Sequence, residues 1–323
     1  MCICTQSWYA GATSVRKGRL KCRQPIRRAL AGGWILESIR VGGVEITSLT
    51  DIEGAFFRLD QVFPGVANDQ WEPYARRYPW AFADRETLRG RVGSYVLRSV
   101  GGTVLVDTGV GPQAMGRGGR LLVELEKAGV GPEDVDTVFL THLHGDHLGW
   151  SVRPDGEPVF PEARYVTQAS EWEISAPYLG RAIVGLDDLG VLELLDGEEP
   201  VGEELTAIPT PGHSPGHSSL LVSSGGEQAL VSGDAIVHPA QATEPTWNVQ
   251  FDMDKEQAAR TREMLLAWLE ADGIPVAAGH IPGSGFGRVA RDGGEAGRRY
   301  WLSMETGQQT DLSGLDLSRG GRS

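Results

Sequence analysis

The stretch Thr141-His142-Leu143-His144-Gly145-Asp146-His147 decides how this chain is interpreted. It follows an apolar run, residues 135–140, that we predict to be a buried strand. Neutral imidazole and carboxylate groups are the usual protein ligands of Zn²⁺ and similar ions. His142 and His144 are two residues apart, so an extended segment points both side chains the same way. Asp146 and His147 lie beyond Gly145 and can face a second ion. The stretch therefore predicts a metal site.

The remaining histidines also stand in turn-like places. His213 and His217 lie in Pro211-Gly212-His213-Ser214-Pro215-Gly216-His217, and His238 comes four residues after Ser232-Gly233-Asp234, which ends another predicted strand. His280 follows Gly279 after a last predicted strand. Binding groups in layered α/β folds sit on loops at strand ends. We therefore expect these loops to gather with residues 141–147 at one site.

Local patterns predict strands followed by a helix, twice, which suggests two similar halves. Residues 63–90 look irregular and aromatic, and residues 71–82 with Trp150 are candidates either for the lining of an apolar pocket or for ordinary core packing. Gln257 is placed to complete a capping box with Asp254 at the start of the second helix. The predicted strands are 44–49, 95–98, 103–107, 135–140, 164–167, 205–208, 220–222, 229–232 and 276–278, and the predicted helices are 121–128 and 254–271.

The charge pattern divides the chain. All 43 acidic residues and 23 of the 30 basic residues follow residue 36, whereas residues 1–36 hold seven basic residues and no acid. The overall charge of −13 opposes a duplex-binding function. No apolar run approaches the length of a membrane-spanning helix. We predict a dispensable basic tail over 1–36, a catalytic domain over 37–305, and a flexible Gly/Ser-rich tail over 306–323.

All three cysteines, Cys2, Cys4 and Cys22, lie in this basic arm. The rest of the chain therefore has no disulfide framework and no thiol chemistry, which fits a reducing cytoplasm. The arm lacks the apolar core of a secretory signal, and a targeting segment or upstream sequence stays an alternative to the tail. We expect a cytoplasmic protein with a small-molecule substrate and no nucleic-acid or membrane partner; a homodimer is compatible with the sequence.

A serine hydrolase is a rival interpretation. Residues Gly212 to Gly216 match the G-x-S-x-G nucleophile elbow, and Ser214, Asp234 and His280 follow the chain order Ser, Asp, His. However, the oxyanion hole needs the backbone N–H of the residue after the nucleophile, and Pro215 has none. The triad would also leave residues 141–147 unexplained.

Taken together, the motifs resemble the metallo-β-lactamase superfamily over about residues 43–290. They are Asp107 in Val-Asp-Thr-Gly, the H-x-H-x-D-H stretch at 142–147, Pro-Gly-His at His213, Gly-Asp at Asp234 and Gly-His at His280. The resemblance implies an α/β (α+β) fold, a four-layer αββα sandwich with the metals at one edge of the sheets.

The resemblance also implies the ligands. One ion would be held by His142, His144 and His213, and the other by Asp146, His147 and His280, with Asp234 bridging the two. Asp107, His217 and His238 would support the ligands from behind, as metal ligands commonly require. Two divalent ions are expected, Zn²⁺ first, with Mn, Co or Fe as alternatives.

Residues 205–290 look most like the N-acyl homoserine lactonase and methyl-parathion-hydrolase-like branch. The similar text is Gly233-Asp234-Ala235-Ile236-Val237-His238-Pro239, Phe251-Asp252, and Gly279-His280-Ile281-Pro282-Gly283. Some lactonases place a tyrosine just after the bridging aspartate to assist the substrate oxygen. Residues 235–239 contain none, and His238 is either a substitute or an ordinary loop histidine.

The resemblance implies a dinuclear metal-dependent hydrolase, in which a hydroxide shared by two ions cleaves an ester, lactone or related bond. Asp146 or Asp234 would shuttle the proton. An iron-dependent oxidoreductase with the same ligands is the alternative from another class.

Overall fold

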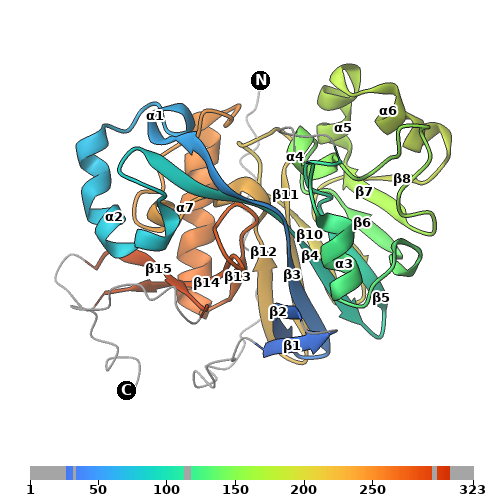
Figure 1. Ribbon diagram of the computed structural model, residues 1–323, viewed down its shortest axis with the longest axis horizontal. Coiled ribbons are helices and arrows are strands. Elements are labelled where there is room, and N and C mark those ends of the chain that lie inside the picture. The colour runs from blue at the N-terminus through green and yellow to red at the C-terminus, as the bar shows by residue number, and fades with distance from the viewer. Residues whose placement is uncertain (1–26, 32–33, 113–117, 293–296, 306–323) are drawn as a thin grey trace, which may run out of the picture.

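The structure is a computed structural model that describes residues 27–31, 34–112, 118–292 and 297–305 (Figure 1). Its two β-sheets face each other in the middle of the molecule, and helices cover the outer face of each (Figure 1). Three buried apolar clusters separate the layers, one between the sheets and one between each sheet and its helices. The predicted four-layer αββα sandwich is confirmed.

Within the described residues the first sheet has eight strands in chain order. Strands β1 to β5 pair antiparallel and β5 to β8 pair in parallel. The strands are β1 Arg27–Ala31, β2 Trp34–Val41, β3 Val44–Arg58, β4 Thr87–Ser99, β5 Gly102–Val106, β6 Thr137–Phe139, β7 Arg164–Gln168 and β8 Leu192–Leu195.

The second sheet has seven strands in the described part of the chain, in the order β15-β14-β13-β12-β11-β10-β9. Its one parallel pair is β12 with β13. The strands are β9 Glu199–Gly202, β10 Leu205–Pro209, β11 Ser218–Ser224, β12 Glu227–Val231, β13 Val276–Ala277, β14 Phe286–Arg291 and β15 Arg299–Ser303.

Strand alternation explains how one sheet serves two cores. Successive side chains of a strand point to opposite faces of the sheet. Leu97 and Val106 therefore enter the core between the sheets, whereas their neighbours Val96 and Leu105 pack against the helices. Both faces are covered, so the predicted strands in this region are almost continuously apolar.

Helices close both outer faces. The first sheet is covered by α3, α5 and α6, and α7 lies on the second sheet (Figure 1). The helices are α1 Leu59–Val62, α2 Glu72–Arg77, α3 Leu121–Lys127, α4 Gly145–Leu148, α5 Ala169–Ser175, α6 Arg181–Asp188 and α7 Lys255–Asp272, with single 3₁₀ turns η1 Asn68–Trp71, η2 Pro79–Ala81, η4 Pro132–Asp134, η5 Ala176–Tyr178, η6 Gly233–Ala235 and η7 Pro239–Ala242.

At the start of α7 the predicted cap by Asp254 is confirmed, but the capping box with Gln257 is not. The Asp254 side chain accepts a hydrogen bond from the backbone N–H of Gln257, which satisfies one free donor of the first turn. The Gln257 side chain does not complete a capping box, because its amide donates to Thr261 Oγ1 one turn further along. Gly273 ends the helix as predicted.

The predicted boundary at residue 37 lies inside β2. Strand β1 lies before that boundary and pairs with residues 34–38. The pairing of β2 with β3 uses Ser38 to Val41, which all lie after it. Residues 1–26 and 306–323 lie outside the described residues, so the roles predicted for both tails stay predictions.

The aromatic segment is core: of the two alternatives for residues 71–82 and Trp150, core packing is confirmed, and pocket lining is not. The apolar cluster formed by α7 and the second sheet buries the rings of Trp71, Tyr74, Tyr78 and Phe82. Trp150 packs on the first-sheet side, where its indole N–H donates to Asp51 Oδ1. Each ring thereby buries large apolar area against a helix or sheet face.

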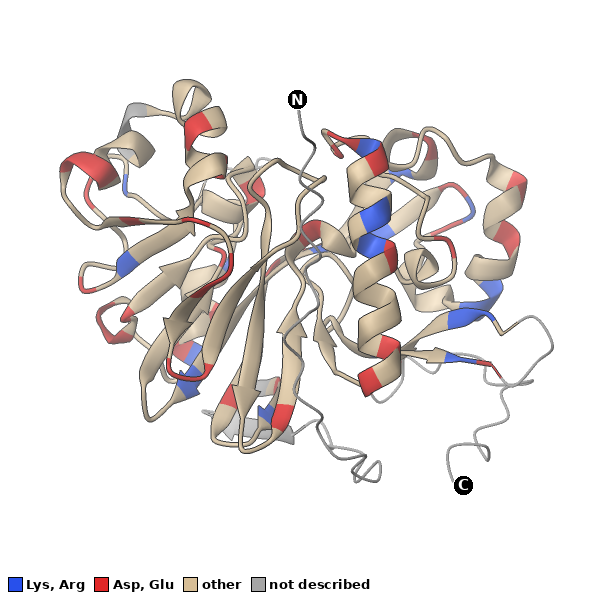
Figure 2. Cartoon of the chain, turned by 180° about the vertical axis from the view of Figure 1, so that it is seen from behind, with Lys and Arg blue, Asp and Glu red and all other residues tan. Residues whose placement is uncertain are grey.

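Acidic positions are spread over loops and helices of both halves (Figure 2). No helix among the described residues is both long enough and apolar enough to cross a membrane.

Candidate metal centre

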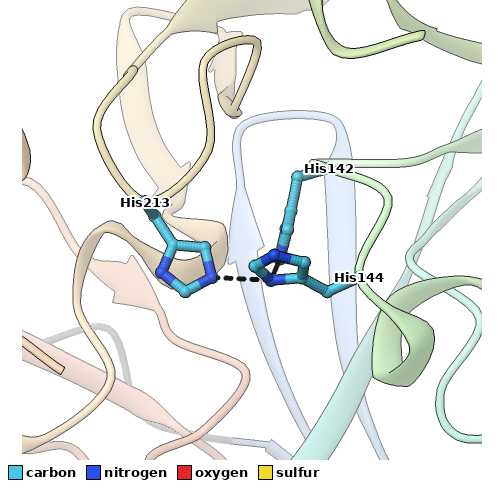
Figure 3. A group of neighbouring side chains, drawn as sticks. All are labelled: His142, His144 and His213. Carbon is cyan, nitrogen blue, oxygen red and sulfur yellow. Dashed lines mark hydrogen bonds between the residues drawn. The ribbon is translucent and has the colours of Figure 1, made fainter. Parts of the chain in front are cut away.

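The loop after β6 carries the first group of histidines. Residues His142 and His144 lie on an extended segment, and Gly145 begins the short helix α4 that carries Asp146 and His147. His142 Nε2 and His213 Nε2 both lie 3.0 Å from His144 Nδ1, so three ring nitrogens converge on one point (Figure 3). His142 and His213 are buried.

His213 reaches this point because its loop is fixed to the start of α7. Its carbonyl accepts a hydrogen bond from Met253, and the carbonyl of Gly212 accepts one from Asp254. Thr261 Oγ1, about two helical turns further on, donates to the carbonyl of Pro211. The Pro-Gly-His motif is therefore held by the helix of the second half while its histidine faces the first.

Asp234 lies between the two groups of candidate ligands. Its Oδ2 lies 3.3 Å from His213 Nε2 and 3.1 Å from His280 Nε2, and its Oδ1 lies 3.4 Å from His147 Nε2. Asp146 Oδ2 lies 3.5 Å from His280 Nε2. All seven predicted ligands thus meet at one place, as three overlapping groups that could each hold an ion: His142, His144 and His213; His142, His147 and Asp234; Asp146, His147 and His280.

Hydrogen bonds at the Nδ1 atoms assign the tautomers of the rings. His147 Nδ1 donates to Asp107 Oδ2 over 2.8 Å, His213 Nδ1 to Asp252 Oδ1 over 2.9 Å, and His280 Nδ1 to the carbonyl of Arg91 over 2.7 Å. With a hydrogen on Nδ1, each of these rings has Nε2 as the nitrogen that faces the centre, and this atom offers a lone pair to an ion when the ring is neutral.

His142 follows the same rule through Thr141. The Thr141 hydroxyl lies within hydrogen-bond distance of both Asp107 oxygens and gives its hydrogen to that carboxylate. Its oxygen then accepts from His142 Nδ1 over 3.1 Å. The Nε2 atoms of His142 and His213 are both bare, and His144 Nδ1 can donate to one of them at most. The three facing ring nitrogens of His142, His144 and His213 therefore have too few hydrogens to satisfy one another.

Two atoms in the middle of the site lack partners. His147 Nε2 and Asp234 Oδ1 are fully buried, and neither makes a hydrogen bond among the described residues. A buried polar atom without a partner costs about 1–3 kcal/mol. Two ligand bonds of about 2.05 Å at a tetrahedral angle separate their donor atoms by about 3.3 Å, close to the separations observed here. The donor set therefore fits divalent cations.

The pKa values reflect this crowding. Burial and the neighbouring His147 hold the pKa of His142 well below its ordinary value, so that ring is neutral. Burial lowers the pKa of His280, but the carboxylates of Asp234 and Asp146 outweigh it and raise that pKa to about 9. Burial raises the pKa of Asp234, but His280, His147 and His213 outweigh it, and the carboxyl stays ionised.

Asp107 contacts the first histidine loop through hydrogen bonds to Thr141 and His147. It ends β5 with a φ of 60°, the one positive φ outside glycine among the described residues. This strained turn aims the carboxylate at Thr141 and His147. A strained backbone is retained where surrounding contacts over-determine it, which is common at functional sites.

His217 supports Asp234 through a hydrogen bond to its backbone. Its Nδ1 donates to the carbonyl of Thr210, and its Nε2 accepts the backbone N–H of Asp234 over 2.9 Å. Burial lowers the pKa of His217 to about 3, so the ring stays a neutral acceptor. A side chain at Gly233, where φ is 50°, would approach His217 Nε2 to 2.5 Å, which explains the glycine before the aspartate.

His238 lies apart from the ligand groups. Its ring Nδ1 accepts a hydrogen bond from the backbone N–H of Ala240, and its backbone N–H donates to the side chain of Gln241. Its hydrogen bonds within the described residues therefore reach none of the seven predicted ligands. The ring packs against Phe63, Trp71 and Phe82, and burial lowers its pKa to about 3. The neutral ring also lines an apolar cavity in front of the site.

Three supporting residues were missed. Asp252 anchors His213, and the family resemblance includes Phe251-Asp252 but implies no role for it. Glu171 is buried behind the site, where its two oxygens accept the backbone N–H groups of Leu143 and Gly216 and so join the two histidine loops. Arg91 supplies the carbonyl that anchors His280. Asp252 and Glu171 are charged residues near predicted strand or helix ends, which is the one signal the sequence offered.

The serine triad is not assembled. Ser214 Oγ is buried and has no hydrogen-bond partner among the described residues. His280, its proposed base, uses Nδ1 for the carbonyl of Arg91 and Nε2 for Asp234. A nucleophile needs its base within hydrogen-bond reach, so this geometry does not support serine catalysis.

A cavity of ≈ 640 Å³ opens in front of the site. At its floor lie His144, Asp146, His213, Asp234 and His280. Its walls are mostly apolar and come from the β3–β4 ribbon, α1 and the loops after β5, η6 and η7, namely Ile52, Phe56, Phe57, Val62, Phe63, Leu88, Val92, Val110, Val237, Val249 and Phe251. An apolar cleft with a few convergent polar groups is the usual form of a small-molecule site.

Part of this chain is similar in sequence to known proteins. "N-acyl homoserine lactonase" from Bacillus sp is 30% identical over 159 residues, which cover 42% of this chain and 60% of that protein. "N-acyl homoserine lactonase AttM" from Rhizobium radiobacter is 29% identical over 171 residues, which cover 49% of this chain and 63% of that protein. The chain thus spans about 60% of the length of these relatives.

Solved structures show the same fold. A structure described as "AidC, a Dizinc Quorum-Quenching Lactonase" in complex with a product is 23% identical, with a TM-score of 0.72 over 84% of this chain and 97% of that one. The "hydrolase AbOPH in beta lactamase superfamily" is 23% identical, with a TM-score of 0.73 over 84% and 98%. The family model of the metallo-beta-lactamase superfamily matches residues 89–280, which run from the cavity wall to the last candidate ligand. This chain belongs to the metallo-beta-lactamase superfamily.

Proposed function

We propose that the protein is a dinuclear metal-dependent hydrolase of a small molecule with an apolar group. The observation that carries the proposal is the pair of ligand groups joined by Asp234 at the floor of an apolar cavity. His142, His144 and His213 would hold one divalent ion, and Asp146, His147 and His280 the other. Zn²⁺ suits this mixture of imidazole and carboxylate. When bound, such ions supply Lewis acidity and lower the pKa of water to about 7.

The chain's own residues then bind and orient the substrate. The apolar walls bind its hydrophobic part and exclude water from the floor of the cavity. This leaves its polar, reacting part beside Asp146 and Asp234. The Asp146 side chain is 37% exposed and that of Asp234 is 7% exposed. Asp146 is therefore the carboxylate that can exchange a proton between the reacting atoms and solvent.

Carboxylic esters and lactones rank ahead of phosphotriesters as substrates. The named relatives are lactonases, and the AidC structure holds "a product N-hexnoyl-L-homoserine", an acyl compound. The largely apolar cavity suits an acyl or aryl group of that kind. An ester also offers a carbonyl oxygen and a leaving oxygen at the short separation that two neighbouring ions can reach.

Two neighbouring residues provide the test. The purified protein is assayed on a panel of esters, lactones and phosphotriesters, together with His213→Ala and Ser214→Ala. His213→Ala should lower turnover by several orders of magnitude, because it removes a predicted ligand. Ser214→Ala should leave turnover nearly intact, because Ser214 contacts no base. Loss of turnover in Ser214→Ala with normal metal content would show that the two-metal proposal is wrong.

A further inference from the structure

Of the arginines that the structure describes, two are almost completely buried. Arg91 lies on β4 and Arg262 on α7, and each is 1% exposed. They belong to different layers, because β4 is in the first sheet and α7 covers the second (Figure 1). A guanidinium in the interior is costly unless its donors are satisfied, so both positions require an explanation.

Arg262 lies behind His213. Its Nη2 donates to Asp252 Oδ2 over 3.3 Å, and Asp252 Oδ1 accepts from His213 Nδ1 over 2.9 Å. Its other donors meet the carbonyls of Ala235 and Pro245. Arg262 thus fixes both the carboxylate that orients His213 and the chain directly after Asp234.

Arg91 lies behind His280, and it has no carboxylate within ion-pair distance among the described residues. Its carbonyl accepts from His280 Nδ1 over 2.7 Å. Its guanidinium donates to Ser48 Oγ over 2.7 Å and to Tyr95 Oη over 3.2 Å. Further donors meet the carbonyl of Leu49 and Thr50 Oγ1, at 2.8 and 3.1 Å.

The hydroxyls of Ser48 and Tyr95, which Arg91 contacts, also bind the loop that carries His280. Ser48 Oγ and Tyr95 Oη both donate to the carbonyl of Ser284, at 2.9 and 3.0 Å. Ser284 stands four residues after His280, between β13 and β14. A side chain at Gly285 would come within 2.3 Å of Tyr95 Oη and 2.7 Å of Arg91 Nη1, so the loop passes closely over the guanidinium.

The two histidines belong to different ligand groups. His213 meets His142 and His144, whereas His280 meets Asp146 and His147. Each is fixed at Nδ1 and presents Nε2 to Asp234 Oδ2. Each is the one member of its group that comes from the second half of the chain, so its placement depends on contacts between distant segments.

We propose that Arg91 and Arg262 are positioning residues, each for one metal position: Arg91 for the position with His280, and Arg262 for the position with His213. This rests on the proposed dinuclear function. Loss of a group that orients a ligand typically costs about 10–100-fold in metal affinity. The two arginines share burial and charge, so a general loss of stability would affect both metal positions alike, whereas positioning affects one.

The test compares Arg91→Lys with Arg262→Lys. Metal-free protein is titrated with Co²⁺, and binding is followed by visible absorption and by metal content. His280→Ala and His213→Ala give the reference spectra for loss of each position. Arg91→Lys should weaken one position by about tenfold or more and give the spectrum of His280→Ala at limiting metal. Arg262→Lys should do the same with the spectrum of His213→Ala.

Milder variants keep the test decisive if a lysine variant fails to fold. Tyr95→Phe removes one bond to Ser284 without touching a candidate ligand and should follow Arg91→Lys. Asp252→Asn should follow Arg262→Lys. Equal weakening of both positions in every variant, or weakening of neither, would overturn the proposal. A wild-type protein that binds no Co²⁺ would instead overturn the proposed function, so the two failures are distinct.

Discussion

Replacement of Asp107 by asparagine tests whether this residue selects the tautomer of a ligand. Asparagine tolerates the left-handed backbone of Asp107. Its single oxygen must stay on the backbone N–H of Thr141, which now lies 2.8 Å from Asp107 Oδ1, because that N–H cannot change its role. The new NH₂ group then faces His147, which has to accept through Nδ1. The hydrogen of His147 moves to Nε2, the atom that faces Asp234.

The structure sets the size of the effects. Asp107→Asn replaces the charged acceptor of Thr141 and His147 with a neutral amide, which should lower the free energy of unfolding of the metal-free protein by about 1–2 kcal/mol. Asp107→Ala adds left-handed strain of about 1 kcal/mol and leaves buried donors of Thr141 and His147 unsatisfied, so the loss should be about 4 kcal/mol. The affinity of the metal position with His147 should fall about 10–100-fold in Asp107→Asn.

Urea denaturation of the metal-free variants and metal titration measure the two effects separately. Asp51→Asn is the matched control. Asp51 is another fully buried carboxylate, which accepts the backbone N–H groups of Val110 and Leu121 and contacts no candidate ligand. That variant should lose stability and keep its metal affinity. If Asp107→Asn loses stability but binds metal like the wild type, the tautomer argument is wrong.

Three further predictions follow from other parts of the chain. A chain that starts at Glu37 should keep its metals and turnover, because the pairing of β2 with β3 begins at Ser38. A chain that starts at Arg27 is the control. If the chain from Glu37 loses metal that the chain from Arg27 keeps, the basic arm contributes to the catalytic fold. Burial and the charge of Glu37 raise the pKa of Glu305 to about 7, so stability from this group is full below about pH 4.5 and is lost as the pH rises through 7. The urea midpoint of Glu305→Gln should therefore rise relative to that of the wild type when the pH is changed from 5 to 8. A difference between the two midpoints that is the same at both pH values would contradict this. Val92→Trp should fill part of the cavity and raise KM most for esters with large acyl groups, with metal content unchanged; an equal change for acetyl and decanoyl esters would argue against the cavity as the acyl site.

The sequence predicted the parts of the fold that local signals specify. Residues 95–98 and 103–107 form a hairpin because apolar runs flank a Gly-Gly turn, and Asp254 and Gly273 bound α7 as expected. Strands β14 and β15 were missed. The glycine at 287 weakens the strand pattern of β14, yet a side chain there would approach the Trp301 ring to 2.1 Å. That requirement comes from a strand twelve or more residues away, and no local pattern contains it.

The same division holds at the site. The seven candidate ligands were implied by a family resemblance, which rests on histidine and aspartate motifs at predicted strand ends, and the structure brings all seven together. Their supports were mostly not found. Glu171, Arg91 and Arg262 act through contacts with loops far along the chain, and a buried charge looks like a surface charge until its neighbours are known. The aromatic segment illustrates the limit: its rings were visible, but the face they pack on was not.

The number of metal ions per chain tests the central claim most directly. Elemental analysis of the purified protein should find about two divalent ions per chain, as in two-metal hydrolases. Asp234→Ala should lower both the metal content and the turnover, because Asp234 lies between both ligand groups. A protein that is free of metal, resists chelators and retains full hydrolytic turnover would contradict the account.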